Sequence, residues 1–206
     1  MVEIMQQPGE VKKTESASKS KAGKDTWSKK AWYAVSSPTV FGEEMIAELP
    51  SLKDTSLIGR NVKVSLSELT KNYKHMHTTV MLKISNIDGK KAKTEYAGQE
   101  LLKDALARLI RRWSSRVDSN QNILLKDKKM RLKMTIITAK KANTAIRATL
   151  RALVIKTSND MLLGRPLDEA VMTLNNDKLT RVIQESASKI FPIRSVEVRK
   201  VEVTKL

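Results

Sequence analysis

The sequence contains no cysteine, only two histidines and only eight aromatic residues. Without cysteine the chain cannot form disulfides, use a thiolate nucleophile or bind a metal through sulfur. It has no apolar run close to the roughly 18 residues of a membrane span, and its first residues lack the apolar segment of a secretory signal. Because aromatics are so few, the core must consist of Leu, Ile, Val, Ala and Met. We therefore expect a cytoplasmic protein with an aliphatic core.

Catalytic motifs are also missing. His75 and His77 would share a face of a strand, but no cysteine supports a metal site there, so we interpret them as a surface pair. Glycine-rich phosphate-binding loops and the Gly-x-Ser-x-Gly motif are absent. The acidic pairs Glu43-Glu44 and Asp168-Glu169 are typical of an exposed strand and of the first turn of a helix. The sequence therefore predicts no catalytic residue, no metal, no cofactor and no small-molecule substrate.

Positive charge is abundant and concentrated in one part of the chain. Lys and Arg total 39 against 22 Asp and Glu, a net charge of +17. Residues 101–156 contain 15 of these cations and 3 of the acids, so they hold +12 of that net charge. Like charges at this density repel one another in a compact fold unless a polyanion neutralises them. The sign and density favour nucleic-acid binding over a merely solvated surface.

Short β-strands are predicted in the first half of the chain. Residues 61–66 and 78–87 alternate apolar with polar side chains, which is typical of half-buried strands. Asp88-Gly89 predicts a tight turn into a return strand over 91–96. Gly98 is expected to end that strand.

The basic region is predicted to contain two helices with a strand between them. Apolar side chains at helical spacing predict a helix over 102–113. Trp113 ends its apolar stripe, so we interpret it as a core residue, with base stacking as the alternative. A polar loop is expected over 114–122, a strand over 125–138 on which Lys129, Arg131 and Lys133 share one face, and a second helix over 142–157.

The remaining chain is predicted to add helices and a final strand. A short helix should begin at Pro166, and an amphipathic helix should span 177–190. The last strand is expected over 196–203. Its alternation slips by one residue at Arg199-Lys200, where a β-bulge would keep its four valines on one face.

These elements predict an α+β fold of mainly antiparallel strands with flanking amphipathic helices. Residues 1–25 have no apolar periodicity, so we expect a disordered basic N-terminal tail. Residues 26–206 would then form a single RNA-binding domain.

Three clusters of cations predict the RNA-binding surface. The first surrounds Ser115 at the end of the 102–113 helix, the second follows the 125–138 strand, and the third begins the 142–157 helix. Arginine forks match phosphate oxygens and also stack on bases. The predicted RNA-binding residues are Lys29, Lys30, Arg60, Arg108, Arg111, Arg112, Ser115, Arg116, Lys126, Lys128, Lys129, Arg131, Lys133, Lys140, Lys141, Arg147, Arg151, Arg199 and Lys200.

Several segments resemble a known family. They are, in order, Ser28 to Tyr33, Phe41-Gly42, Leu49-Pro50, Leu57 to Leu66, Gly98 to Asp118, Ile146-Arg147, Leu150-Arg151, Ile190 to Arg194 and Val196 to Val203. Their order and spacing resemble the archaeal and eukaryotic small-subunit ribosomal protein family called "three-a" in eukaryotes, and most closely its archaeal type.

The resemblance implies a structural protein of the ribosomal platform, without catalysis or a cofactor. It also implies a β-barrel-like body with flanking helices. The implied partners are small-subunit ribosomal RNA, neighbouring ribosomal proteins and messenger RNA near its exit, with no membrane partner.

Two other classes stay open on the residues alone. A free RNA-binding or RNA-processing factor is the first, although processing would require a catalytic group. A protein of anionic membrane surfaces is the second, although it would need a helix with a wide exposed apolar face.

Overall fold

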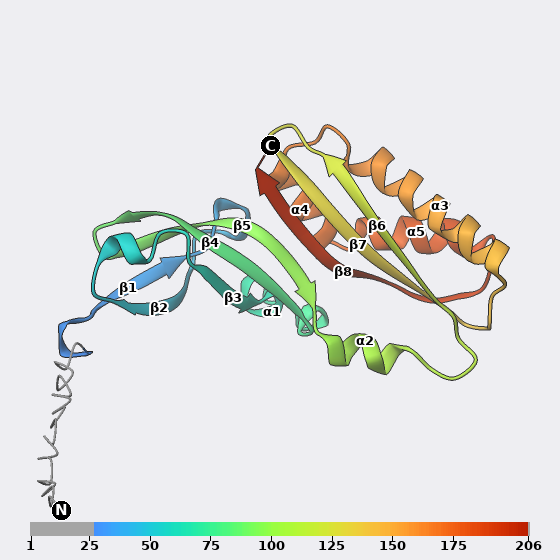
Figure 1. The fold of residues 1–206 in the computed structure, drawn as a ribbon, viewed down its shortest axis with the longest axis horizontal. Coiled ribbons are helices and arrows are strands. Elements are labelled where there is room, and N and C mark those ends of the chain that lie inside the picture. The colour runs from blue at the N-terminus through green and yellow to red at the C-terminus, as the bar shows by residue number, and fades with distance from the viewer. Residues whose placement is uncertain (1–26, 206) are drawn as a thin grey trace, which may run out of the picture.

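The computed structural model describes residues 27–205, which form a branched sheet and five α-helices (Figure 1). The strands are β1 (Ala31–Ser36), β2 (Met45–Ser51), β3 (Asn61–Ser65), β4 (Thr78–Asp88), β5 (Lys91–Leu101), β6 (Arg116–Leu124), β7 (Lys128–Thr138) and β8 (Ile193–Lys205). The helices are α1 (Leu66–Thr70), α2 (Lys103–Leu109), α3 (Thr144–Leu162), α4 (Leu167–Asn175) and α5 (Lys178–Ser188). The expected tail over 1–25 lies outside the described residues.

Strand β5 connects the two parts of the sheet, one formed by β1–β5 and the other by β6–β8. One edge of β5 pairs with β4, which also pairs with β3. The other edge pairs first with β1, in parallel, and then with β8, in antiparallel orientation. Strands β1–β5 therefore form one end of the fold and β6–β8 the other, as Figure 1 shows.

The α+β class is confirmed, and the strand pairs are antiparallel except for β1 with β5. Within residues 27–205, strands β2, β3 and β6 each pair with a single neighbour. The sheet is therefore open, and the expected barrel-like closure is not observed.

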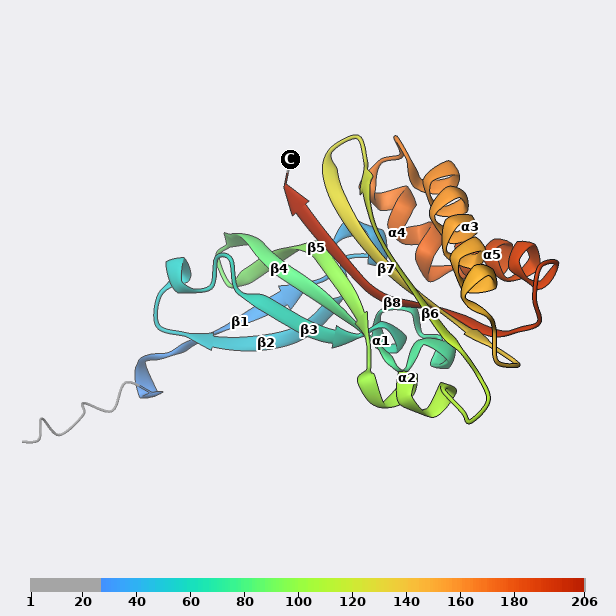
Figure 2. The same cartoon turned by 45° about the vertical axis from the view of Figure 1, so that its right-hand side comes forward.

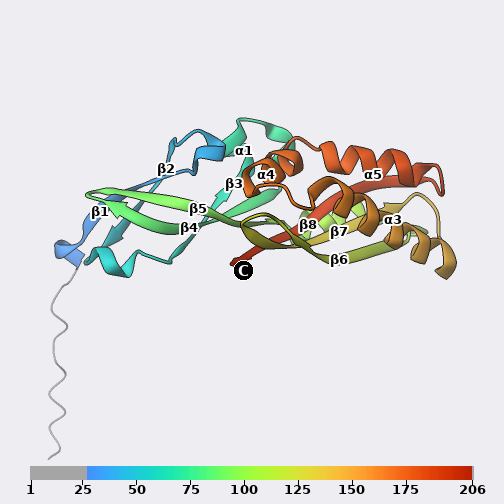
Figure 3. The ribbon, with the colours of Figure 1, turned by 90° about the horizontal axis from the view of Figure 1, so that it is seen from above.

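Helices α3, α4 and α5 cover one face of β6–β8 (Figures 1 and 3). Strand β7 lies in the middle of these three strands, and its side chains alternate between buried and more exposed from Lys129 to Met134. Its side chains Met130, Leu132, Met134 and Ile136 are at most 1% exposed and pack beneath the helices. The three helices supply Leu150, Val171 and Ile183 to the same core, among others. The core is aliphatic as expected, with two buried tyrosines, Tyr33 and Tyr96, in addition.

Helices α1 and α2 lie where the two ends meet (Figure 2). The apolar residues Ala105, Leu106 and Leu109 of α2 pack against Leu101 and Ile137, on the face of β7 that the other helices leave open. This part of the predicted apolar stripe is confirmed.

The predicted helix over 102–113 is too long, because α2 ends at Leu109 and Ile110 is already extended. The predicted polar loop over 114–122 is also wrong. Strand β6 begins at Arg116, which pairs with Ile137 of β7. The pairing partner is 21 residues away, so neither the early helix end nor the strand is encoded in a local pattern.

The predicted bulge in the last strand is confirmed. Lys133 pairs with Lys200 and Met134 pairs with Val198, so Arg199 has no partner in the register. The extra residue returns Val201 to the helix-covered face, where it is fully buried, and Val196 on the other side of the bulge is 6% exposed.

Gly98 does not end the return strand, contrary to expectation. It lies inside β5, opposite Glu202, where β5 begins to pair with β8. A Cβ atom at this position would lie 2.2 Å from the carbonyl oxygen of Val201. Only glycine permits this approach, so Gly98 is required for the junction between the two ends.

Gly98→Ala should therefore lower the free energy of unfolding by about 3 kcal/mol, because the new methyl group forces backbone apart. Gly89→Ala is the control: that turn has open space around the site, and its positive φ of 61° costs only about 1–2 kcal/mol. Chemical denaturation measures both. Equal losses for the two variants would contradict the close-approach argument.

Candidate nucleic-acid interface

The alternation of β7 also determines where its cations lie. Because Met130, Leu132 and Met134 face the helices, Lys129, Arg131 and Lys133 point to the opposite, open face of the sheet. The predicted shared face of these three cations is confirmed. On the adjacent strand β8, the bulge region contributes Arg199 and Lys200.

One carboxylate on this open face contacts several of the cations. Glu202 lies 2.9 Å from the Lys200 ammonium, 3.6 Å from that of Lys133 and 3.9 Å from the guanidinium of Arg131. Its hydrogen bond with Lys200 raises the pKa of that lysine and lowers the pKa of Glu202. The acid holds the three like charges close together, and cationic charge still exceeds acidic charge on this face.

The connection from α2 to β6 forms a tight turn that is bonded to the next loop. The Ser115 amide donates to Thr138 Oγ1 over 2.9 Å, and the Thr138 amide donates to the Ser115 carbonyl over 3.0 Å. The Ser115 hydroxyl accepts from the Ala142 amide over 3.0 Å. Ser115 was predicted to contact RNA, but its polar groups mainly join this turn to the start of α3.

This turn places the three arginines Arg111, Arg112 and Arg116 at the surface. Lys140 and Lys141 are exposed in the loop bonded to it, so the first and third predicted clusters lie together. Figure 1 shows this connection at the lower right, beside the beginning of α3.

Asp118 links the turn to the sheet face. Its carboxylate accepts from Arg116 Nε over 2.9 Å and from Thr135 Oγ1 over 2.7 Å. Partial burial opposes its ionisation, yet these bonds and the charges of Arg116 and Arg199 lower the pKa of Asp118. Sequence reasoning did not identify this acid, although Arg116 and Asp118 are two residues apart on one strand and so share a face.

The arginines of α3 extend the cationic surface around the free edge of β6. Arg151 Nε donates over 2.9 Å to the backbone carbonyl of Asp118. One helical turn earlier, Arg147 Nη2 donates over 3.3 Å to Thr144 Oγ1, whereas its buried Nε has no partner. Arg151 thus satisfies an edge carbonyl of β6 while its remaining donors stay at the surface.

We call this combined region the basic surface. It consists of Arg111, Arg112, Arg116, Lys129, Arg131, Lys133, Lys140, Lys141, Arg147, Arg151, Arg199 and Lys200. It extends from the open face of β7 and β8 to the turn before β6 and the beginning of α3.

The other predicted RNA-binding residues are not part of the basic surface. Lys128 points to the opposite face of β7 from Lys129, where its ammonium lies 2.9 Å from Glu95. Lys126 is in the turn between β6 and β7, and Arg108 is on α2. Lys29, Lys30 and Arg60 belong to the end of the fold that contains β1–β5, and the Lys30 ammonium is 4.0 Å from the centre of the Trp27 ring.

Trp113 belongs to the same turn as Arg111, Arg112 and Arg116, and its prediction as a core residue is wrong. It is 80% exposed and has a φ of +67°, because the helix has already ended. The turn that exposes it is fixed by the long-range bonds of Ser115, which no local periodicity reveals.

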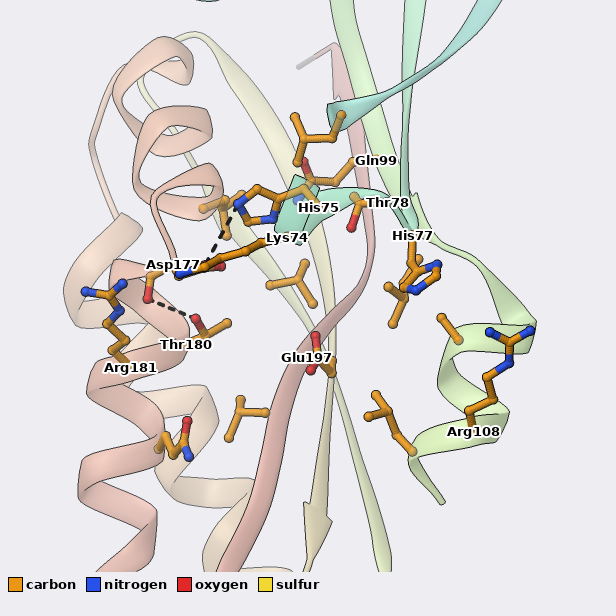
Figure 4. Close-up of a pocket in the computed structure, with 18 residues that line it drawn as sticks. Lys74, His75, His77, Thr78, Gln99, Arg108, Asp177, Thr180, Arg181 and Glu197 are labelled. Atoms are coloured by element: carbon orange, nitrogen blue, oxygen red, sulfur yellow. Dashed lines mark hydrogen bonds and ion pairs between the residues drawn. The ribbon is translucent and has the colours of Figure 1, made fainter. Parts of the chain in front are cut away.

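A cavity of about 500 Å³ lies between α2, α5 and β8 (Figure 4). His75 and His77 line it, and His75 Nε2 is 3.9 Å from the Asp177 carboxylate. Glu197 also lines it, and burial together with the charge of Asp177 raises the pKa of Glu197. Within the described part of the chain, no three His, Cys, Asp or Glu side chains are grouped to hold a metal.

Glu197 yields a pH-dependent stability prediction. Because the folded state holds the Glu197 proton more tightly than the unfolded chain, its ionisation destabilises the fold above the raised pKa and has no effect well below about pH 4. Glu197→Gln should therefore increase the free energy of unfolding at pH 7 and leave it unchanged at acidic pH. Glu185→Gln, at an exposed position of α5, controls for the loss of one negative charge. A stability loss at pH 7 in Glu197→Gln alone would refute the prediction.

No helix within residues 27–205 is long and apolar enough to cross a membrane.

Comparison with known proteins identifies the family. Residues 18–206 match the model of the Ribosomal S3Ae family. The small ribosomal subunit protein eS1 of Desulfurococcus amylolyticus is 35% identical over 185 residues, which cover 87% of this chain and 85% of the relative.

Two other archaeal relatives agree with this result. The protein of the same name from Methanobrevibacter smithii is 29% identical over 181 residues, covering 87% of this chain and 94% of the relative. The one from Saccharolobus islandicus is 31% identical over 184 residues, covering 89% and 88% respectively. Because the family model and the relatives all match nearly the whole of the described chain, the chain belongs to the Ribosomal S3Ae family.

Proposed function

We propose that the basic surface binds the phosphate backbone of small-subunit ribosomal RNA. As a member of its family, the chain is a structural, non-catalytic protein of the small ribosomal subunit and acts in translation in the cytoplasm. Family membership does not say which of its surfaces contacts RNA. The proposal for which surface contacts RNA rests on the cations of β7, β8, the turn before β6 and α3.

The single observation that supports this proposal is the continuity of the basic surface. The Asp118 carboxylate forms an ion pair with Arg116 of the first cluster, and the charge of Arg199 helps to lower its pKa. The backbone carbonyl of Asp118 accepts a hydrogen bond from Arg151. Segments that are far apart in the chain thus present their cations together. Such a surface suits a polyanion whose charges repeat every few ångströms.

The residue types favour phosphate over base-specific recognition. Arg predominates around the turn, and its fork of donors matches two phosphate oxygens at once. Phosphate contacts fix the position and orientation of a protein on RNA, whereas A-form helices are recognised mainly by shape. We therefore propose that the basic surface positions a folded RNA segment rather than reading its sequence.

The finer parts of the proposal concern organisation and partners. We propose that residues 26–206 act as one RNA-binding domain, preceded by the 1–25 tail, and that other faces contact neighbouring ribosomal proteins. Proximity to messenger RNA at its exit, which the family resemblance implies, belongs to the same proposal. Lys29, Lys30, Arg60, Arg108, Lys126 and Lys128 would then contact RNA or proteins away from the basic surface.

Sedimentation of tagged chain in a cell lysate tests the general assignment. The chain should migrate with small ribosomal subunits. Recovery only in the free fraction would favour a free RNA-binding factor. Recovery with membranes would favour a protein that binds anionic membrane surfaces.

A double substitution tests the basic surface itself. Arg111→Ala with Arg112→Ala should leave the free energy of unfolding nearly unchanged, since both side chains are exposed, and should weaken binding to ribosomal RNA. For every phosphate that the variant no longer binds, the slope of log affinity against log salt should decrease by about 0.7–0.9. Lys90→Ala with Lys91→Ala, two exposed cations at the β4–β5 hairpin, is the matched control. Equal losses in both double variants would mean that net charge alone drives binding.

A further inference from the structure

Trp113 is a large apolar side chain placed among cations. It is 80% exposed, and Arg111, Arg112 and Arg116 are within three residues of it in the same turn. Exposing a tryptophan to water is unfavourable, because aromatic side chains contribute large areas of apolar surface when buried. Its position therefore indicates a contact that the isolated chain does not supply.

The backbone holds Trp113 in this position at an energetic cost. Its φ of +67° lies in the left-handed region, which is unfavourable for a residue other than glycine. Ser114 compensates locally: its hydroxyl donates to the Arg111 carbonyl over 2.6 Å and accepts from the Arg111 amide over 3.2 Å. The Ser115 bonds to Thr138 and Ala142 anchor the other side of the turn. The indole is thus presented on a braced turn.

The surroundings of Trp113 determine what kind of partner fits it. A membrane surface would need several apolar side chains beside the indole, whereas the exposed side chains of this connection are Arg111, Arg112, Arg116 and only one further apolar residue, Ile110, at 36% exposure. A protein partner that covered the indole would also have to neutralise Arg111 and Arg112, whereas Arg116 already pairs with Asp118. An RNA supplies both the negative charge and the apolar contact, since its phosphates pair with the guanidinium groups and its bases have flat apolar faces.

We propose that Trp113 stacks on an unpaired nucleobase of the RNA that the basic surface binds. This inference rests on the proposed function and adds a specificity to it. Arg111, Arg112 and Arg116 hold phosphates on either side, and the indole packs against a base that is not engaged in a pair. Stacking accepts any of the four bases but cannot reach a base inside a continuous duplex. The chain therefore distinguishes RNA with an unpaired nucleotide beside a helix from fully paired RNA.

Fluorescence of Trp113 tests the stacking directly. Replacing Trp27 and Trp32, both of which are exposed, by Phe leaves Trp113 as the only tryptophan of the chain. Titration with a ribosomal RNA fragment that contains unpaired nucleotides should quench its emission at saturation. A fully paired RNA of equal length should bind more weakly and leave the emission nearly unchanged. Equal quenching by both RNAs, or none by either at saturation, would overturn the stacking proposal.

Substitutions measure the energetic effect. Trp113→Ala should weaken binding to the fragment with unpaired nucleotides by about 5- to 150-fold, the range for loss of one base stack, without changing the salt slope. Trp113→Phe should recover most of that affinity. Tyr73→Ala is the matched control, because Tyr73 is 88% exposed outside the basic surface, and it should have no effect.

The two proposals fail in distinguishable ways. If the Arg111 and Arg112 double variant binds RNA as tightly as the unaltered chain, the assignment of the basic surface is wrong. If that variant loses affinity and salt dependence while Trp113→Ala binds RNA normally, the basic surface binds RNA as proposed and the stacking of Trp113 is overturned.

Discussion

Strand β7 buries four aliphatic side chains beneath three helices, and this burial constrains every charged residue around it. An unpaired cation on the helix-covered face would have to lose its hydration, at a cost of several kcal/mol. Alternation therefore directs Lys129, Arg131 and Lys133 to the open face. The bulge at Arg199 serves the same constraint in β8, because it returns Val201 to the core and leaves Lys200 outside. The part of the basic surface that lies on β7 and β8 is therefore the outer face of this core.

Two long-range contacts then bring the rest of the surface to β7. Ser115 bonds the turn before β6 to Thr138 and Ala142, which sets the arginines of that turn beside the beginning of α3. Gly98 allows β8 to approach β5, so the last strand of the chain lies beside β7 with Lys200 on the open face. A region of the sequence with high charge density becomes a continuous patch because these contacts fold it around a single core.

Alternation and turn chemistry made much of this fold predictable from sequence. The strand predicted over 125–138, the turn at Asp88-Gly89 and the bulge at Arg199 all follow from local pattern, and all are present, although the strand begins only at Lys128. The end of α2, the beginning of β6 and the exposure of Trp113 do not, because they depend on Ser115 bonding to residues more than 20 positions away. For the same reason the sequence indicated which residues are cationic but not that Lys128 pairs with Glu95, 33 positions away.

Lysine modification of free and assembled protein tests the central claim most directly. Lys129, Lys140 and Lys141 are exposed members of the basic surface, so an amine-reactive reagent should label all three in the free chain. In intact small subunits the same three lysines should be protected, and digestion of the RNA should restore their labelling. Lysines 129, 140 and 141 that react as readily in intact subunits as in the free chain would contradict the account.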